Sequence, residues 1–198
     1  GLLAPYTFKG GSYPGTGGTC TATIASGTCT IIIEFTPTST GTFNDTIELS
    51  YFDGLNNQTT NRPVTGVGQN PAVLTISDGA IYDFGQLALT NTGEKTLTVT
   101  NSGDVEATSV TGGGLAAPFT FKGGSYPGTG GTCGSSISPG TCTIVISYNP
   151  STAATHNDTA WLDYNDGVSS QYTERDLTGT GLSPASLSIS DGATYDFG

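Results

Sequence analysis

The sequence predicts an all-β protein made of tandem β-sandwich repeats, each about 113 residues long. Three observations favour this fold class. Apolar and polar residues alternate with a period of two, turn residues separate the alternating runs, and a long stretch of the sequence recurs. The chain is 34% hydrophobic, with 8 Phe and 9 Tyr, so a packed core is expected rather than disorder.

The repeat is visible directly in the letters. GLLAPYTFKGGSYPGTGGTC at residue 1 returns as GLAAPFTFKGGSYPGTGGTC at residue 114, and the match continues without a gap to the last residue. A period of this length exceeds the roughly 20–50 residues of solenoid units and fits one small domain per repeat. Gly-, Asn- and Pro-containing stretches at 65–71 and 178–184 are interpreted as linkers between repeats.

These linkers set the expected domain boundaries. Residues 1–70 are expected to form the C-terminal part of an incomplete repeat, residues 71–183 a complete repeat, and residues 184–198 the first strand of a following repeat. We expect the chain to be an interior piece of a longer protein, because it opens with Gly rather than Met. An incomplete sandwich exposes sheet edges, so residues 1–70 are expected to need strands from further chain or from a neighbour.

Short alternating runs indicate the strands. In each run the apolar residues share one face, as in a half-buried strand. Such faces are formed by Ile31, Ile33 and Phe35, by Ile144, Ile146 and Tyr148, by Ile47, Leu49 and Tyr51, by Leu74 and Ile76, and by Leu97 and Val99. Roughly seven or eight short strands per repeat, separated by turn residues, predict a two-sheet sandwich of the immunoglobulin-like kind.

The four cysteines form two pairs with the same spacing, Cys20 with Cys29 and Cys133 with Cys142. The residues between the first two predict a tight hairpin with Gly27 in its turn, which would place the cysteines on neighbouring strands. We expect two disulfides, and therefore an oxidising extracellular or cell-surface compartment. The alternatives are reduced buried thiols or a zinc site, for which each repeat offers two Cys and the whole chain one His.

The acidic composition disfavours some classes of partner. The chain has 16 acidic and 5 basic residues, for a net charge of −11. Nucleic acid and anionic membranes are not expected as partners, because binding them requires many Lys and Arg. No apolar run reaches the roughly 20 residues that span a bilayer. The acidity is expected to keep a surface protein soluble, or else to collect divalent cations.

Five stretches in a fixed order suggest a family. They are DGAIYDFG, LTNTGEKTLTVTNSGD, PFTFKGG, PGTCTIVISYNP and LTGTG. Together they resemble the choice-of-anchor D repeats of large exported bacterial proteins, which are related to the ASPM–SPD-2–Hydin (ASH) immunoglobulin-like domains. The resemblance covers essentially all of residues 71–181. It implies a bacterial, extracellular role as a spacer, adhesive stalk or fibre unit, and it brings no catalytic residues.

Motifs that suggest enzyme chemistry have simpler interpretations. Asp-Phe-Gly at 83–85 and 196–198 spells the metal-binding triplet of protein kinases, but the other kinase motifs do not occur in order. His156, the single histidine, has Phe43 as its counterpart in the first copy, which argues against a general base. We therefore expect a structural His and no enzyme activity.

Two features are candidates for binding. Asp78 and Asp83, repeated as Asp191 and Asp196, lie near the repeat junction, where calcium could stiffen an array. No D-x-D-x-D loop is present, so solvated turn carboxylates and no cofactor are expected. Trp161 stands where the first copy has Glu48. We expect it to pack against a loop or a neighbouring subunit, and the alternative is stacking on a ligand such as a sugar.

The sequence as a whole predicts a structural protein. We expect repeats strung head to tail in an extracellular fibre, stalk or filament, with strands completed by the neighbouring unit of the same kind. The first alternative is an adhesin-type binding module that recognises a glycan or a protein. The second is a non-catalytic appendage of a secreted hydrolase.

Overall fold

The computed structural model describes residues 1–190 and 192–198. Over these residues the chain forms twelve strands and no helix, so the fold is all-β, and no helix is present that could cross a membrane. The chain divides into two compact units, Gly1–Asn70 (unit 1) and Pro71–Gly198 (unit 2). Each unit is described by itself.

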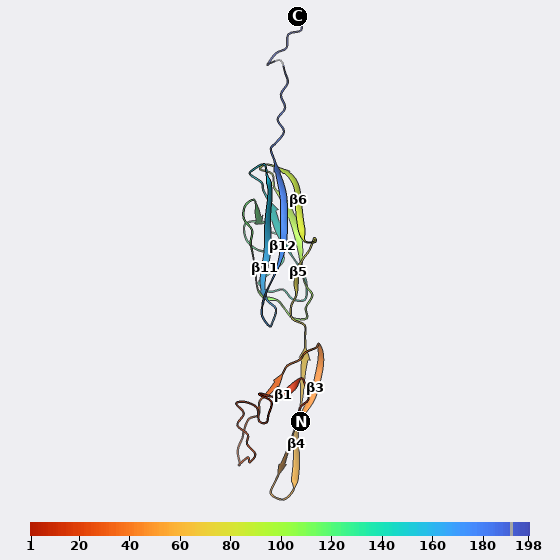
Figure 1. Ribbon diagram of the computed structural model, residues 1–198, viewed down its shortest axis with the longest axis vertical. Helices are drawn as coiled ribbons and strands as arrows, with labels where there is room; N and C mark the ends of the chain where they lie inside the picture. Colours follow the sequence, from red (N-terminus) through yellow and green to blue (C-terminus); the bar gives the residue numbers. More distant parts are fainter. Residues whose placement is uncertain (191) are drawn as a thin grey trace. The chain divides into compact units, whose positions relative to one another are not determined.

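Unit 2 consists of two four-stranded sheets (Figure 1). The first has the order β5-β7-β10-β9, formed by Leu74–Ile76, Gly93–Asn101, Gly140–Tyr148 and Phe119–Phe121. The second has the order β6-β12-β11-β8, formed by Ile81–Ala88, Ser170–Leu182, Thr155–Asn165 and Thr108–Gly113. Strand pairs are antiparallel except for β6, which runs parallel to β12.

One apolar core lies between these two sheets. Its fully buried members come from both, and include Leu97, Ile144, Ile146, Leu162 and Leu177, all at most 1% exposed. An aromatic cluster closes one part of it, where Phe119 stacks on Tyr148 at 4.7 Å between ring centroids and Phe84 of β6 packs against both rings. Burying a side chain of this size contributes roughly 1.5–3 kcal/mol, so the core holds the two sheets together.

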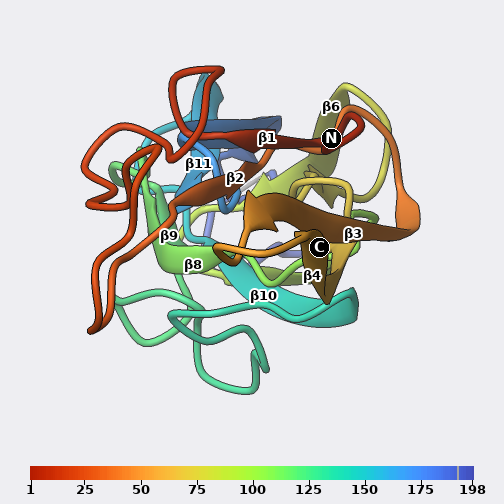
Figure 2. The ribbon, with the colours of Figure 1, turned by 90° about the horizontal axis from the view of Figure 1, so that it is seen from below.

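Unit 1 contains two separate strand pairs. Strand β1, Tyr6–Phe8, pairs with β2, Ile33–Phe35 (Figure 2). Strand β3, Gly41–Phe52, pairs with β4, Asn57–Gly68, as a long two-stranded ribbon (Figure 1).

These pairs repeat the registers of unit 2 with the sequence offset of the repeat. Tyr6 pairs with Phe35 as Phe119 pairs with Tyr148. In the same way β3 and β4 pair as β11 and β12 do, so that Thr42 faces Val67 and Thr155 faces Thr180. Among the described residues, unit 1 therefore has the counterparts of β9 to β12 and none of β5 to β8.

The prediction that 65–71 and 178–184 are linkers is wrong for their first residues. Residues 65–68 belong to β4, and 178–182 belong to β12. The glycines serve close packing rather than flexibility, because a Cβ on Gly179 would meet ring carbons of Tyr148 at 2.7 and 2.8 Å. A Cβ on Gly66 would likewise meet the Phe35 ring at 2.8 Å.

The prediction of a disulfide across a two-stranded hairpin needs a correction. Cys142 lies in β10, but Cys133 lies in the preceding loop, and no residue from 20 to 29 is in a strand. Residues 134–139, between the cysteines of unit 2, form no strand, although Ile137 makes an isolated bridge with Ala107. Instead, Thr132 donates its backbone N–H to the Thr143 carbonyl at 2.9 Å and so fastens the loop to the strand.

We predict that Gly179→Ala destabilises unit 2, because the added methyl group overlaps the fully buried Tyr148 ring. The free energy of unfolding should fall by about 1–3 kcal/mol, as for other overpacked cores. Urea unfolding followed by the fluorescence of Trp161, the single Trp, measures this in unit 2.

Gly134→Ala is the matched control. Its new Cβ would lie 3.6 Å from the nearest atom, an ordinary contact, so the free energy of unfolding should stay within about 0.5 kcal/mol of the wild type. Equal effects of the two substitutions would show that contact with Tyr148 does not constrain β12.

Candidate functional site

In unit 2 the short strand β5 is fastened to the opposite sheet as well as to β7. The N–H of Ala72 donates to the carbonyl of Asp166 at 2.9 Å, and the N–H of Leu74 donates to the hydroxyl of Tyr164 at 3.2 Å. Arg175 of β12 donates from Nη2 to the carbonyl of Ile76. These three links leave from alternate residues, 72, 74 and 76, whose side chains are all buried. β5 thus covers the end of the core.

Unit 1 carries the same receiving groups, but they are exposed. Asp53, Tyr51 and Arg62 are the counterparts of Asp166, Tyr164 and Arg175 in the repeat, with the residue types unchanged. Tyr51 is 52% exposed, whereas Tyr164 is 7% exposed. The receiving surface for a β5-like strand is therefore present in unit 1 and uncovered in this chain.

The second open feature of unit 1 is the outer edge of β4. In unit 2, β12 lies between β11 and β6. In unit 1, β3 is the one strand paired with β4 among the described residues. An unpaired strand edge presents a row of free N–H and C=O groups and can accept another strand.

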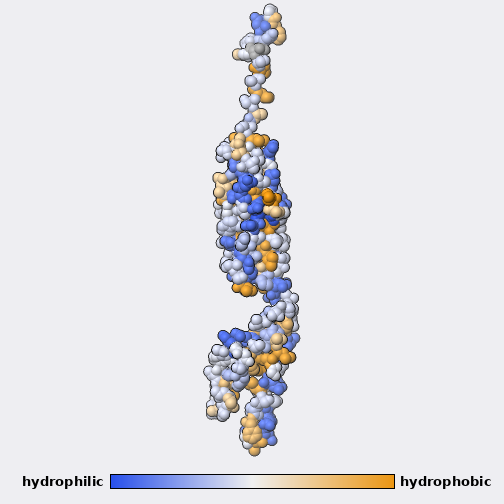
Figure 3. Space-filling model, viewed as in Figure 1, coloured by the Kyte–Doolittle hydropathy of each residue, from blue (hydrophilic) through white to orange (hydrophobic). Residues whose placement is uncertain are grey.

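The apolar face of unit 1 is open in the same way. Ile31, Ile33 and Phe35 are half-buried, whereas their counterparts Ile144, Ile146 and Tyr148 are completely buried. Further along the ribbon, Phe52 and Leu55 are exposed. Figure 3 shows apolar residues in orange on the visible surface of this unit. Exposed apolar surface of this kind is a candidate site for association.

The residue types of β5 in unit 2 recur near residue 190. Leu187 and Ile189 are the counterparts of Leu74 and Ile76. They are 97% and 95% exposed, whereas Leu74 and Ile76 are 3% and 4% exposed. Residues 183–190 and 192–198 form no strand. The expectation that 184–198 is the first strand of a following repeat stays a prediction.

Trp161, the predicted interface residue, lies in β11 and is half-buried. Its ring rests on Gly113 and Gly114, where no side chain larger than Gly would fit. It borders an open groove of about 700 Å³ whose wall also includes Asp158, Asp176 and Ile81. Unit 1 has a smaller groove of about 400 Å³ at the matching positions 44–46 and 63–65. Trp161 therefore packs on its own sheet and also faces a groove.

The single histidine has a structural environment. His156 Nδ1 lies 2.9 Å from the Tyr148 hydroxyl, and Nε2 lies 3.0 Å from the Thr152 hydroxyl. Both ring nitrogens are thus engaged by hydroxyl groups. Phe43 fills this place in unit 1, 6.0 Å from Phe35 between ring centroids.

The candidate calcium ligands are engaged locally. Asp78 forms an ion pair with Lys95 at 3.2 Å, and Asp83 accepts the N–H of Gly85 at 2.7 Å. Hydrogen bonds from Ser77 and then Lys95 hold the pKa of Asp78 below its usual range. Asp191 lies outside the described residues. Within the described part of the chain, no three His, Cys, Asp or Glu side chains come together as a metal site would require.

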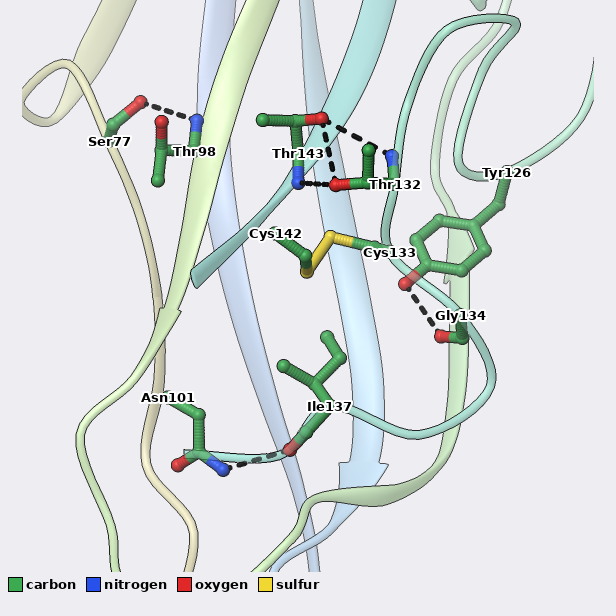
Figure 4. Close-up of a disulfide and its surroundings, with 10 residues drawn as sticks. All are labelled: Ser77, Thr98, Asn101, Tyr126, Thr132, Cys133, Gly134, Ile137, Cys142 and Thr143. Carbon is green, nitrogen blue, oxygen red and sulfur yellow. Dashed lines mark hydrogen bonds between the residues drawn. A yellow bond between two sulfur atoms is a disulfide. The ribbon is translucent and has the colours of Figure 1, made fainter. Parts of the chain in front are cut away.

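The structure contains the two disulfides Cys20–Cys29 and Cys133–Cys142, and none of the described cysteines is free. In unit 2 the bonded loop packs into the core through Ile137, whose carbonyl accepts a hydrogen bond from Asn101 at 2.9 Å (Figure 4). Tyr126 closes the other side by donating its hydroxyl to the Gly134 carbonyl at 3.1 Å (Figure 4). Burial raises the pKa of Tyr126 to about 12.

These features define an all-β protein with one closed two-sheet unit, one open unit, and disulfide-fastened loops that suggest an oxidising environment. Three similar solved structures are the VesB protease of Vibrio cholerae, the ASH/PapD-like domain 7 of human CEP192, and a protein of unknown function from Porphyromonas gingivalis W83. No known protein family and no curated protein matches the chain.

The similarities to these structures are distant. VesB is 13% identical, with 56% of this chain and 32% of VesB covered and a TM-score of 0.44, so the chain spans about a third of VesB. The CEP192 domain is 15% identical. The match covers 59% of this chain and 89% of the CEP192 domain, with a TM-score of 0.43. The P. gingivalis protein is 12% identical. The match covers 75% of this chain and 70% of the P. gingivalis protein, with a TM-score of 0.43.

The CEP192 domain is of the ASH type that the sequence resembles. Similarities at this level carry no conclusion about activity. Membership of the choice-of-anchor D repeats, and the expectation that the chain is not an enzyme, stay predictions.

We predict that unit 2 loses stability in acid partly through Asp166. The carboxylate of this buried residue accepts the N–H groups of Ser169 and Val168 at 2.6 and 2.7 Å, which lowers its pKa. The contribution of this carboxylate to the free energy of unfolding is present above the ordinary Asp pKa of about 3.9 and is lost as the pH falls below that value. Asp166→Asn should therefore lower stability at pH 7 and flatten its decline below about pH 4, measured by urea unfolding at each pH.

We predict that removing the disulfide of unit 2 with Cys133→Ala and Cys142→Ala lowers its unfolding free energy by about 2.5–3 kcal/mol, the loop-closure value for this spacing. Trp161 fluorescence during urea unfolding provides the measurement. Cys20→Ala with Cys29→Ala is the matched control and should leave the Trp161 transition in place. An equal shift from both pairs would contradict a local effect.

Proposed function

We propose that this chain is a structural repeat of a long extracellular fibre, stalk or filament. The repeats would be assembled head to tail, with the open sheets of unit 1 completed by strands of a neighbouring unit. The observation that carries the proposal is the contrast between identical residues in two settings: Tyr164 and Arg175 are buried in unit 2, while Tyr51 and Arg62 are exposed in unit 1. The surface that β5 covers in unit 2 is therefore exposed in unit 1.

The chemistry of the rest of the chain supports a structural role. A disulfide in each unit suits an oxidising compartment and stiffens the loop beside the core. Glycines 66, 68, 179 and 181 are packed against neighbouring groups, so β4 and β12 are closely packed near their C-terminal ends. The net charge of −11 opposes unspecific clumping.

A second candidate is an adhesin-type module that binds a glycan or a protein. The specific observation in its favour is the groove beside Trp161, because the matching position in unit 1 is Glu48. Titrating the chain with oligosaccharides while recording Trp161 fluorescence tests this function. A saturable change that is lost in Asp176→Ala would support it, and an unchanged spectrum would count against it.

We predict that the chain self-associates in a concentration-dependent manner at about 0.15 M salt, where long-range repulsion is largely screened. Light scattering after gel filtration measures the mass, and negative-stain electron microscopy shows the form. Chains or filaments with a repeating spacing are expected. A single monomeric species across the whole concentration range would refute the fibre proposal.

A further inference from the structure

The open surface of unit 1 matches two stretches of the chain itself. Resting on the proposed function, we propose that residues 185–189 and 194–198 of a second copy, called the donor stretches, bind unit 1. They would do so in the register that residues 72–76 and 81–85 occupy in unit 2. The occupant is therefore a second copy of this chain, and the contacts are specified residue by residue.

The first donor stretch keeps each residue that fastens β5. Ala72, Leu74 and Ile76 of unit 2 correspond to Ala185, Leu187 and Ile189. The groups that receive them, Asp166, Tyr164 and Arg175, correspond to Asp53, Tyr51 and Arg62. All six residue types are unchanged.

The contacts of the first donor stretch follow from this identity. In the complex the N–H of Ala185 donates to the Asp53 carbonyl, and the N–H of Leu187 donates to the Tyr51 hydroxyl. Arg62 then donates to the carbonyl of Ile189. The side chains of Leu187 and Ile189 pass from almost full exposure to burial.

The second donor stretch extends the sheet at the open edge of β4. In unit 2, Leu177 faces Tyr82 and Thr178 faces Asp83 in the parallel pair of β12 and β6. The same register places Tyr195 beside Val64 and Asp196 beside Thr65. This strand would supply hydrogen-bonding partners for the free edge of β4.

Phe197 of the second donor stretch has a matching pair of aromatic rings in unit 1. Phe84 packs against Phe119 and Tyr148 with ring centroids 5.7 and 5.5 Å apart. In unit 1 the corresponding positions are Tyr6 and Phe35, whose rings already lie 4.9 Å apart. Phe197, which is 92% exposed, is the counterpart of Phe84 and would complete the same cluster.

A cross-linking experiment on the full chain tests the register. The variant Thr65→Cys with Asp196→Cys places thiols at facing positions of two copies, and a short bismaleimide joins them without reacting with the native disulfides. A ladder of covalent dimers, trimers and larger species is expected in denaturing gels. Thr59→Cys with Asp196→Cys is the control, because position 59 lies towards the turn of the β3–β4 ribbon, away from the proposed pairing. It should give no ladder.

Each other outcome has a definite meaning. Cross-linked monomer alone would overturn the proposal, because the occupant would be the chain's own stretch. Assembly without cross-linking at 65 and 196 would overturn the register and leave the fibre function intact. A wild-type chain that stays monomeric would remove the fibre function itself.

A matched pair of charge substitutions tests the burial. Ile189→Asp puts a carboxylate into the proposed contact, whereas Val168→Asp changes another exposed residue, in the β11–β12 turn. Ile189→Asp should weaken association at least about tenfold, since burying such a side chain contributes about 1.5–3 kcal/mol. Val168→Asp should leave association unchanged. Equal association of both variants would overturn the proposal even if filaments form.

Discussion

The closed unit depends on the inner face of β12. Along this strand the alternate residues 175, 177, 179 and 181 are all buried. Leu177 belongs to the core, Gly179 admits the Tyr148 ring, and Gly181 lets the chain pass close to Pro150. The same strand pairs with β11 on one side and β6 on the other. One strand therefore sets how closely the two sheets approach, and a single added methyl group on its face would push them apart.

Arg175 adds a buried charged group to this face of β12, and that group needs hydrogen-bond partners. It is 9% exposed, and within the described residues its Nε has no hydrogen-bond partner. Burying a guanidinium is costly unless it is hydrogen-bonded, and the Ile76 carbonyl is the partner that Nη2 has. β5 is thus needed to satisfy β12 as much as to cover the apolar core. In unit 1 the equivalent Arg62 is exposed to solvent, where water satisfies it without a strand.

The chain consequently presents the same receiving surface twice, once covered and once open. The repeat duplicates both the receiving surface and the segment that covers it. A segment that fits the surface of one copy therefore also has the residues that fit the surface of the other copy. In the proposed assembly, recognition between repeats would therefore need no separate binding site. The two disulfides fasten loops in the two units and suggest an oxidising environment.

The amino-acid order alone predicted the all-β class, several of the strands and the cysteine pairs, because alternation and spacing are local properties of the sequence. The two-residue periods at Ile144–Tyr148 and Leu74–Ile76 correspond to buried strands in unit 2. Only the tertiary structure decided the role of the Thr-Gly-x-Gly segments, since Gly179 and Gly181 look like linker residues until Tyr148 and Pro150 are seen against them. The fastening of β5 by Tyr164 and Arg175 was equally hidden, because those contacts join residues 90 and 99 positions apart. Sequence periodicity carries no information about which distant backbone group meets a buried side chain.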